Sequence, residues 1–122
     1  MLRMKPAAAA LLCAAALGAC QRAGPSQIAG ADPARGKVLI GRIGCGSCHL
    51  IPGVDGANGL VGPSLAHMSR RTIIAGFLPN TSDNMVRWLR TPQSVLPGNA
   101  MPNMEIDDHD ARDVAAYLYT LR

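Results

Sequence analysis

Aromatic side chains are scarce in this sequence: Phe, Trp and Tyr together make up 3% of the 122 residues. A small chain with so few rings buries little surface through its side chains alone, and a bulky prosthetic group would repair that deficit. Alternating apolar and polar stretches are also absent, which argues against a β-rich domain, and no internal repeat is present. We therefore expect one small all-α domain with long loops.

The sequence also lacks an apolar run that would cross a bilayer comfortably. The longest run, residues 7–19, follows two basic residues and is typical of a signal peptide. It ends in LGAC, which resembles a bacterial lipobox. We predict that residues 1–19 are removed and that Cys20 carries lipid at the start of a linker, residues 20–31, rich in small and polar residues. Ordinary signal peptidase cleavage is the alternative.

Only four cysteines occur, and two of them belong to the N-terminal segment. The remaining pair, Cys45 and Cys48, has three chemical interpretations. A thioredoxin-like dithiol would need a strand before it and a βαβ context, and neither is visible. A zinc site would need a second pair of ligands, but His67 and His109 stand far apart and have no cysteine beside them.

The third interpretation follows from CGSCH, residues 45–49, because C-x-x-C-H is the attachment signature of haem c. Two thioethers hold such a haem, and the adjacent imidazole is delivered to the iron. We predict one haem c, attached covalently through Cys45 and Cys48, with His49 as an iron ligand.

Without residues 1–19 the chain keeps ten basic against eight acidic residues, and two haem propionates would offset this excess of positive charge. The net charge therefore gives no reason to expect nucleic-acid binding.

Capping residues and apolar spacing predict three helices. The first begins at Asp32 and Pro33, and its apolar face consists of Val38, Leu39, Ile40 and Ile43. The second is capped by Thr81 or Ser82 and ends before Pro92, with a buried face of Met85, Val86, Trp88 and Leu89. The third is capped by Asp107, with Asp110 three residues on, and its apolar stripe is Val114, Ala115, Leu118 and Leu121.

Four motifs, CGSCH, GPSL, PGNAMP and AAYLYTL, occur in this order. With them the chain resembles the class I cytochromes c across nearly the whole mature domain. The resemblance implies the class I fold over residues 32–122, with three to four helices and long loops wrapped around the haem. It also implies that Gly36 and Ile40 on the first helix meet Tyr117 on the last.

The same resemblance implies a second iron ligand. A thioether in that position favours ferrous iron. Met101, in the stiff PGNAM loop, matches the axial methionine of the family, and Met104 is second choice. Met68 and Met85 are expected to fill gaps in the core. His67 and His109 are not expected to bind iron.

Five further residues are implied to lie at the cofactor. The carbonyl of Pro63 would accept a hydrogen bond from His49, and Leu65 would pack on the haem face. Arg71 falls at a propionate-binding position, and Asn99 lies in the methionine loop. Trp88 stands where many relatives keep a tyrosine, so its N–H would point to the methionine sulfur or a propionate, unless the ring is simply core.

A narrower likeness covers RTIIAG, LPNT and the WL and PQ pairs between residues 71 and 93. These resemble the cytochrome c domain fused to subunit II of bacterial haem-copper oxidases of the caa3 type. Together with the lipobox-like LGAC and the expected ligands His49 and Met101, they favour a lipid-anchored electron carrier on the periplasmic side, which is no enzyme by itself, has no small-molecule substrate and delivers electrons to a terminal oxidase. The alternatives are an electron acceptor of a periplasmic dehydrogenase and a gas-binding or peroxidatic haem protein.

Overall fold

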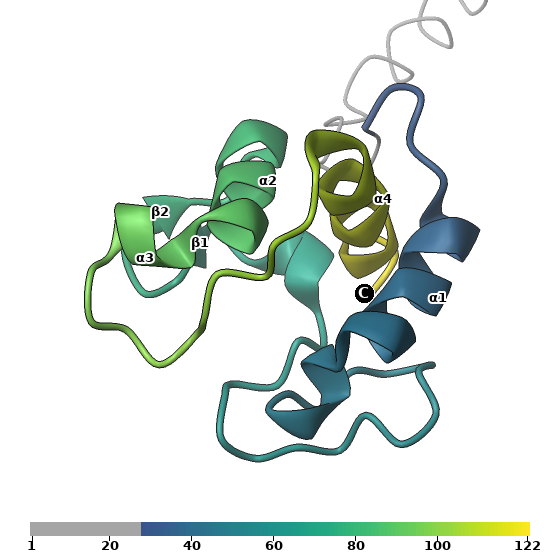
Figure 1. Cartoon of the computed structure of the whole chain (residues 1–122). Helices are drawn as coiled ribbons and strands as arrows, with labels where there is room; N and C mark the ends of the chain where they lie inside the picture. Colours follow the sequence, from purple (N-terminus) through teal and green to yellow (C-terminus); the bar gives the residue numbers. More distant parts are fainter. Residues whose placement is uncertain (1–27) are drawn as a thin grey trace, which may run out of the picture.

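The computed structural model describes residues 28–122, so the expected signal peptide and Cys20 lie outside the described residues. Its elements are, in chain order, α1 (Pro33–Ile43), the 3-10 turns η1 (Cys45–Ser47) and η2 (Met68–Arg70), the strands β1 (Ile73–Ile74) and β2 (Leu78–Pro79), and the helices α2 (Ser82–Arg90), α3 (Pro92–Val95) and α4 (Asp108–Leu118). Long loops join them (Figure 1). This is the mostly helical architecture that the sequence predicts. None of the helices within residues 28–122 has the length and apolar character needed to cross a membrane.

Helix α1 starts as its sequence predicts, because the Asp32 carboxylate accepts hydrogen bonds from the N–H groups of Ala34 and Arg35 at 2.9 and 3.1 Å. It ends at Gly44, whose φ of 87° lies in the left-handed region. The expected apolar face needs one correction: Val38 is 57% exposed. Gly36 turns its backbone toward α4, and a residue two positions further along a helix points to the opposite side.

The other two predicted helices also begin at their expected caps. The Thr81 hydroxyl accepts a hydrogen bond from the N–H of Asn84, and the Asp107 carboxylate accepts one from the N–H of Asp110. Besides the 3-10 turns, three elements lie outside the three helices predicted from caps and spacing, although the resemblance allows a fourth helix. Helix α3 is a single turn that starts at Pro92, and β1 pairs antiparallel with β2 in a hairpin of two residues per strand. Strands this short are below the length at which alternation becomes visible in a sequence.

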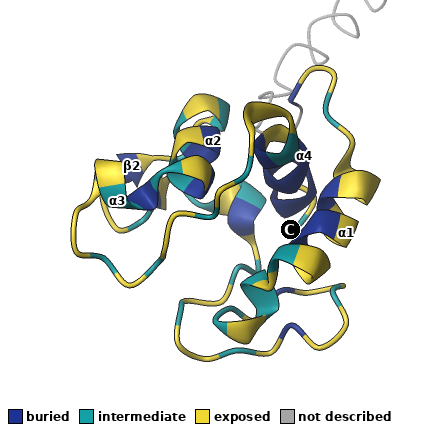
Figure 2. Ribbon diagram, viewed as in Figure 1, coloured by how far each residue is buried: buried dark blue, intermediate teal, exposed yellow. Residues whose placement is uncertain are grey.

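The core lies where α1 and α2 pack against α4 (Figure 2). A Cβ at Gly36 would overlap the carbonyl oxygen of Asp113 and approach the nitrogen of Val114 to 3.0 Å, so the backbones of α1 and α4 are in contact there. Gly36 therefore meets the turn before Tyr117. Ile40 and Tyr117 belong to the same core cluster, and the Tyr117 hydroxyl donates to the carbonyl of Pro52 at 2.7 Å, which ties α4 to the loop after the CGSCH motif.

A buried carboxylate strengthens the crossing of α1 and α4. Asp113 is 1% exposed, and its oxygens accept from the N–H of Asp32 at 2.8 Å and from Arg35 Nη1 at 2.5 Å. Desolvation by itself would raise the pKa of Asp113, but the hydrogen bonds from Asp32 and Arg35 and the charges of His109 and Arg35 outweigh it and hold this pKa below its usual value. Asp110 also forms an ion pair with Arg35.

We expect Asp113→Asn to destabilise the haem-loaded protein by about 2–3 kcal/mol at neutral pH, because an amide turns a donor toward Arg35. The folded-state pKa of Asp113 is lowered, so its contribution is complete above the unfolded value of about 3.9 and fades as the pH falls through the folded value. The difference in unfolding free energy between the two proteins should therefore shrink below about pH 4. Urea titration at several pH values measures it. Asp108→Asn, at a carboxylate that is 52% exposed, is the control, and an equal loss there would contradict the assignment.

Candidate haem site

The CGSCH segment forms one tight turn directly after α1. Cys45 begins η1, and its carbonyl accepts hydrogen bonds from the N–H groups of Cys48 and His49 at 3.3 and 3.0 Å. Both cysteines are free thiols with partly buried side chains, and Cys45 packs against the core. Burial raises the pKa of the Cys45 thiol, which keeps it protonated at neutral pH. The turn therefore presents two neighbouring thiols that are not joined to each other.

The orientation of His49 is fixed by the acceptor that the sequence predicts. Its Nδ1 lies 2.7 Å from the carbonyl oxygen of Pro63. A carbonyl only accepts, so Nδ1 carries the proton and Nε2 keeps the lone pair that a metal needs. A hydrogen bond of this kind sets both the tautomer and the direction of a metal-binding imidazole.

Three glycines bring the loop after His49 tightly against the motif. A Cβ at Gly62 would lie 2.6 Å from His49 Nδ1, and one at Gly59 would lie 2.5 Å from the carbonyl oxygen of Ser47. A Cβ at Gly46 would lie 2.6 Å from the Cα of Ala57. Each approach is closer than a side chain allows, so the packing of this loop requires glycine at all three positions.

The loop that carries Met101 is held together by amide side chains. Gln93 Nε2 donates to the carbonyls of Asn99 and Met101, both at 2.8 Å, and Gln93 Oε1 accepts from the N–H of Gly98 at 3.1 Å. Asn99 accepts from the N–H of Met101 at 2.8 Å and donates to the carbonyls of Pro92 and Leu96. Asn99 thus shapes the loop itself, and its contact with a cofactor stays a prediction.

Sequence reasoning missed the part played by Gln93. The PQ pair was noted only as a point of likeness, and nothing in the sequence shows that one amide would bond to three backbone groups of the next turn. In the structure this amide sets the path of the segment between α3 and Met101.

The four methionines of the described chain separate into two kinds. Met68 and Met85 are 4% and 2% exposed, as expected of gap-fillers in the core. Met101 and Met104 are partly buried, and of the two Met101 is the one packed against the core. Met101 therefore combines contact with the core, partial exposure and a constrained loop, which is what a side chain offered as a ligand requires.

The remaining residues predicted to contact the cofactor are Leu65, Trp88 and Arg71. Leu65 and Trp88 are partly buried and pack against the core. Arg71 Nη2 donates to the carbonyls of Ser64 and Ala66, so this guanidinium braces the loop that also holds Pro63, and its contact with a propionate stays a prediction. His67 and His109 are exposed, and no group of three or more His, Cys, Asp or Glu side chains within residues 28–122 is arranged to hold a metal ion.

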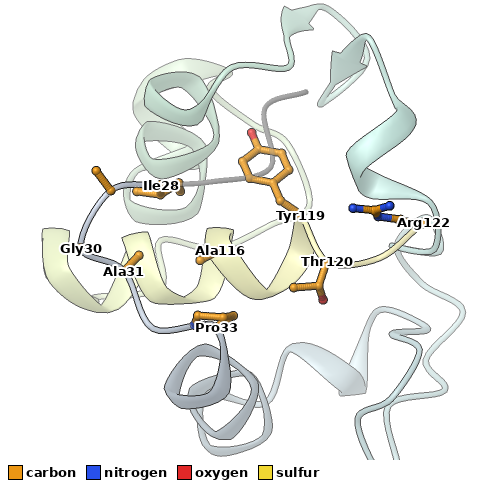
Figure 3. A pocket seen from close by; sticks show the side chains of 9 residues that line it. Ile28, Gly30, Ala31, Pro33, Ala116, Tyr119, Thr120 and Arg122 are labelled. Carbon is orange, nitrogen blue, oxygen red and sulfur yellow. The ribbon is translucent and has the colours of Figure 1, made fainter. Parts of the chain in front are cut away.

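A separate pocket of about 600 Å³ lies between residues 28–33 and the end of α4 (Figure 3). Tyr119 lines it, and its hydroxyl donates to Asn80 Oδ1 at 2.9 Å. Burial raises the pKa of Tyr119 to about 12, so the phenol is neutral. None of the predicted haem residues lines this pocket.

The donor set fits haem c. Two free thiols stand beside an imidazole whose Nε2 is available, and a thioether is offered from a second, constrained loop. Thiols add to the vinyl groups of haem, and imidazole with thioether is a known axial pair for its iron. Cys45, Cys48, His49 and Met101 are the residues that would hold it.

Comparison with known proteins agrees with this chemistry. The profile of the cytochrome c family matches residues 33–122. The chain is 33% identical over 89 residues to cytochrome c oxidase subunit 2 of Alkalihalophilus pseudofirmus, a stretch that covers 72% of this chain and 25% of that protein. It is 31% identical over 87 residues to the subunit 2 of Bacillus subtilis (70% and 24%) and 41% identical over 59 residues to that of Bacillus sp. strain PS3 (47% and 17%). The chain thus spans a quarter or less of each relative's length.

Proposed function

Because this chain belongs to the cytochrome c family over residues 33–122, we propose that it is an exported, membrane-tethered monohaem cytochrome c that passes single electrons to a terminal haem-copper oxidase. The observation that carries the proposal is the arrangement at CGSCH: two free thiols beside an imidazole whose Nδ1 is held by Pro63. The haem that they would hold supplies a one-electron iron couple.

The residues of the chain account for the rest of an electron carrier. Cys45 and Cys48 would hold the cofactor covalently, so it would stay with the protein through many cycles. His49 and Met101 would both bind the iron, which would leave no open site for a substrate. The hydrogen bond from Gln93 holds the backbone of Met101 in place, so its thioether would need little rearrangement when the charge of a bound iron changes.

The proposed acceptor follows from the relatives, which are subunits of cytochrome c oxidase. Likeness to a quarter of their length supports a respiratory oxidase as partner of this chain. We expect the pre-reduced, haem-loaded protein to be oxidised rapidly by oxygenated membranes of its own organism, and cyanide to block that oxidation. Stopped-flow absorbance follows the reaction. Slow oxidation that is indifferent to cyanide would contradict the proposal and favour the dehydrogenase partner.

The membrane tether is a second prediction, since Cys20 lies outside the described residues. Ile28, the first described residue, is 8% exposed and packs in the core. The chain from Cys20 to Ile28 extends at most roughly 26–29 Å, which would keep the domain near the bilayer and raise its local concentration at an integral-membrane partner. We expect Cys20→Ser to move the protein from the membrane to the soluble fraction. Unchanged fractionation would exclude lipid at this cysteine.

A further inference from the structure

Two large apolar side chains stand in solvent beside the CGSCH motif. Leu60 is 87% exposed and Val61 is 79% exposed, more than the other exposed apolar side chains within residues 28–122. They are neighbours in the loop between η1 and η2, and we call this pair the tip of that loop. An exposed tip accepts polar residues freely, so an adjacent apolar pair there indicates a contact site.

The backbone holds this tip against the haem-binding turn. The N–H of Gly59 donates to the carbonyl of Gly46 at 3.0 Å, and the N–H of Gly62 donates to the carbonyl of Cys48 at 2.7 Å. Gly59 and Gly62 are also the two positions whose missing Cβ lets the loop touch Ser47 and His49. Leu60 and Val61 bulge outward between these two fixed points, so their position relative to Cys48 is set by the fold.

The segments next to the tip in sequence carry little charge, and the nearest charged residues along the chain are Asp55 and Arg70. No Asp, Glu, Lys or Arg occurs from residue 56 to residue 69, or in the methionine loop from residue 91 to residue 104. The cation that contacts the loop is Arg71, which donates to the carbonyls of Ser64 and Ala66. These two segments therefore offer no charged side chains to a partner that binds through complementary charges.

We infer that Leu60 and Val61 form an apolar contact through which an electron-transfer protein with an uncharged, apolar surface docks beside Cys48. The inference rests on the proposed electron-carrier function. Docking there would bring the partner beside Cys48, one of the two residues that would hold the cofactor, over a small area. Because formal charges are absent from the tip and from the methionine loop, complex formation depends on apolar burial and only weakly on salt.

The test uses the full-length, haem-loaded protein and membranes of its own organism, with cyanide-sensitive oxidation as the readout. For the wild type we expect the second-order rate to change by less than about twofold between about 0.01 and 0.15 M salt, over which the Debye length falls from about 30 to 8 Å. For the double variant Leu60→Gln, Val61→Thr we expect the rate to fall by about tenfold, as for the central residues of an interface. Val38→Thr makes the same isosteric change at an exposed valine of α1 and should keep the wild-type rate.

Two further measurements separate docking from an effect on the cofactor. The double variant should keep the absorption spectrum and reduction potential of the wild type, and its reaction with a small inorganic oxidant should be unchanged. A shifted potential would show that these side chains cover the haem, which overturns the inference. A wild-type rate that falls tenfold or more with salt, or a double variant with the wild-type rate, also overturns it.

Other outcomes identify a different occupant or a different function. Concentration-dependent dimerisation of the wild type that the double variant loses would assign the tip to contact between copies of this chain and overturn the inference. If the wild type shows no cyanide-sensitive oxidation at all, the proposed function fails and the inference fails with it.

Discussion

Met101→Ala is expected to abolish the weak absorption between the methionine sulfur and ferric iron. With no thioether in reach, the sixth position opens to water, and the reduction potential should fall by roughly a tenth of a volt or more, within the range of about 0.8 V that axial ligands span. The reduced variant should also bind carbon monoxide. Absorption spectroscopy with and without carbon monoxide, together with a potentiometric titration, measures all three changes.

Met104→Ala is the matched control, because it removes the same side chain three residues further on. Met104 is not among the side chains packed against the core, whereas Met101 is, and the carbonyl of Met101 is held by Gln93 at 2.8 Å. We expect the control to keep the sulfur absorption and to exclude carbon monoxide. The reverse pattern would make Met104 the ligand. A wild-type protein that binds carbon monoxide when reduced would instead support the gas-binding alternative.

The helices were predictable because their signals are local. Asp32, Thr81 and Asp107 each accept a hydrogen bond from a backbone N–H of the first turn, and such caps depend on a few neighbouring residues. The exposure of Val38 was not predictable in the same way. Val38 is apolar and lies in an apolar run, but the close contact of Gly36 with α4 decides which face of α1 is buried. That contact joins segments far apart in the sequence.

The same distinction between local signals and contacts of distant segments applies to the haem site. The motif identifies His49, and the resemblance supplies Pro63 as its acceptor; in the structure His49 Nδ1 lies 2.7 Å from the carbonyl oxygen of Pro63. The network of Gln93 and Asn99 was beyond sequence reasoning, since amide side chains have many possible partners and the loop path that selects among them is itself a product of folding. The exposed position of Leu60 likewise follows from backbone hydrogen bonds on either side of it, whereas its apolar character alone predicts burial.

Gly62→Ala is expected to disturb His49 more than any other single methyl group added to the loop. The new Cβ would lie 2.6 Å from Nδ1 and 2.9 Å from Nε2, and closer still to Cε1, so it would overlap the whole ring. The backbone of Gly62 has little freedom to move away, because its N–H donates to the carbonyl of Cys48 at 2.7 Å. The ring must therefore tilt, and the hydrogen bond from Nδ1 to Pro63 is lost.

Overpacking of this kind costs about 1–3 kcal/mol in folding, and loss of the partner that orients a metal-bound histidine typically weakens the site by about 10–100-fold. We expect Gly62→Ala to lower the yield of protein with attached haem and to shift the remaining haem toward a high-spin spectrum. Gly41→Ala is the control: apart from its chain neighbours and the backbone of its own helix, no heavy atom lies within 4 Å of the added Cβ, and alanine there should stabilise α1 by about 0.5–1 kcal/mol. Wild-type spectra and unfolding curves for Gly62→Ala would show that the loop shifts away at little cost, and the close contact with the ring would then have no part in holding His49.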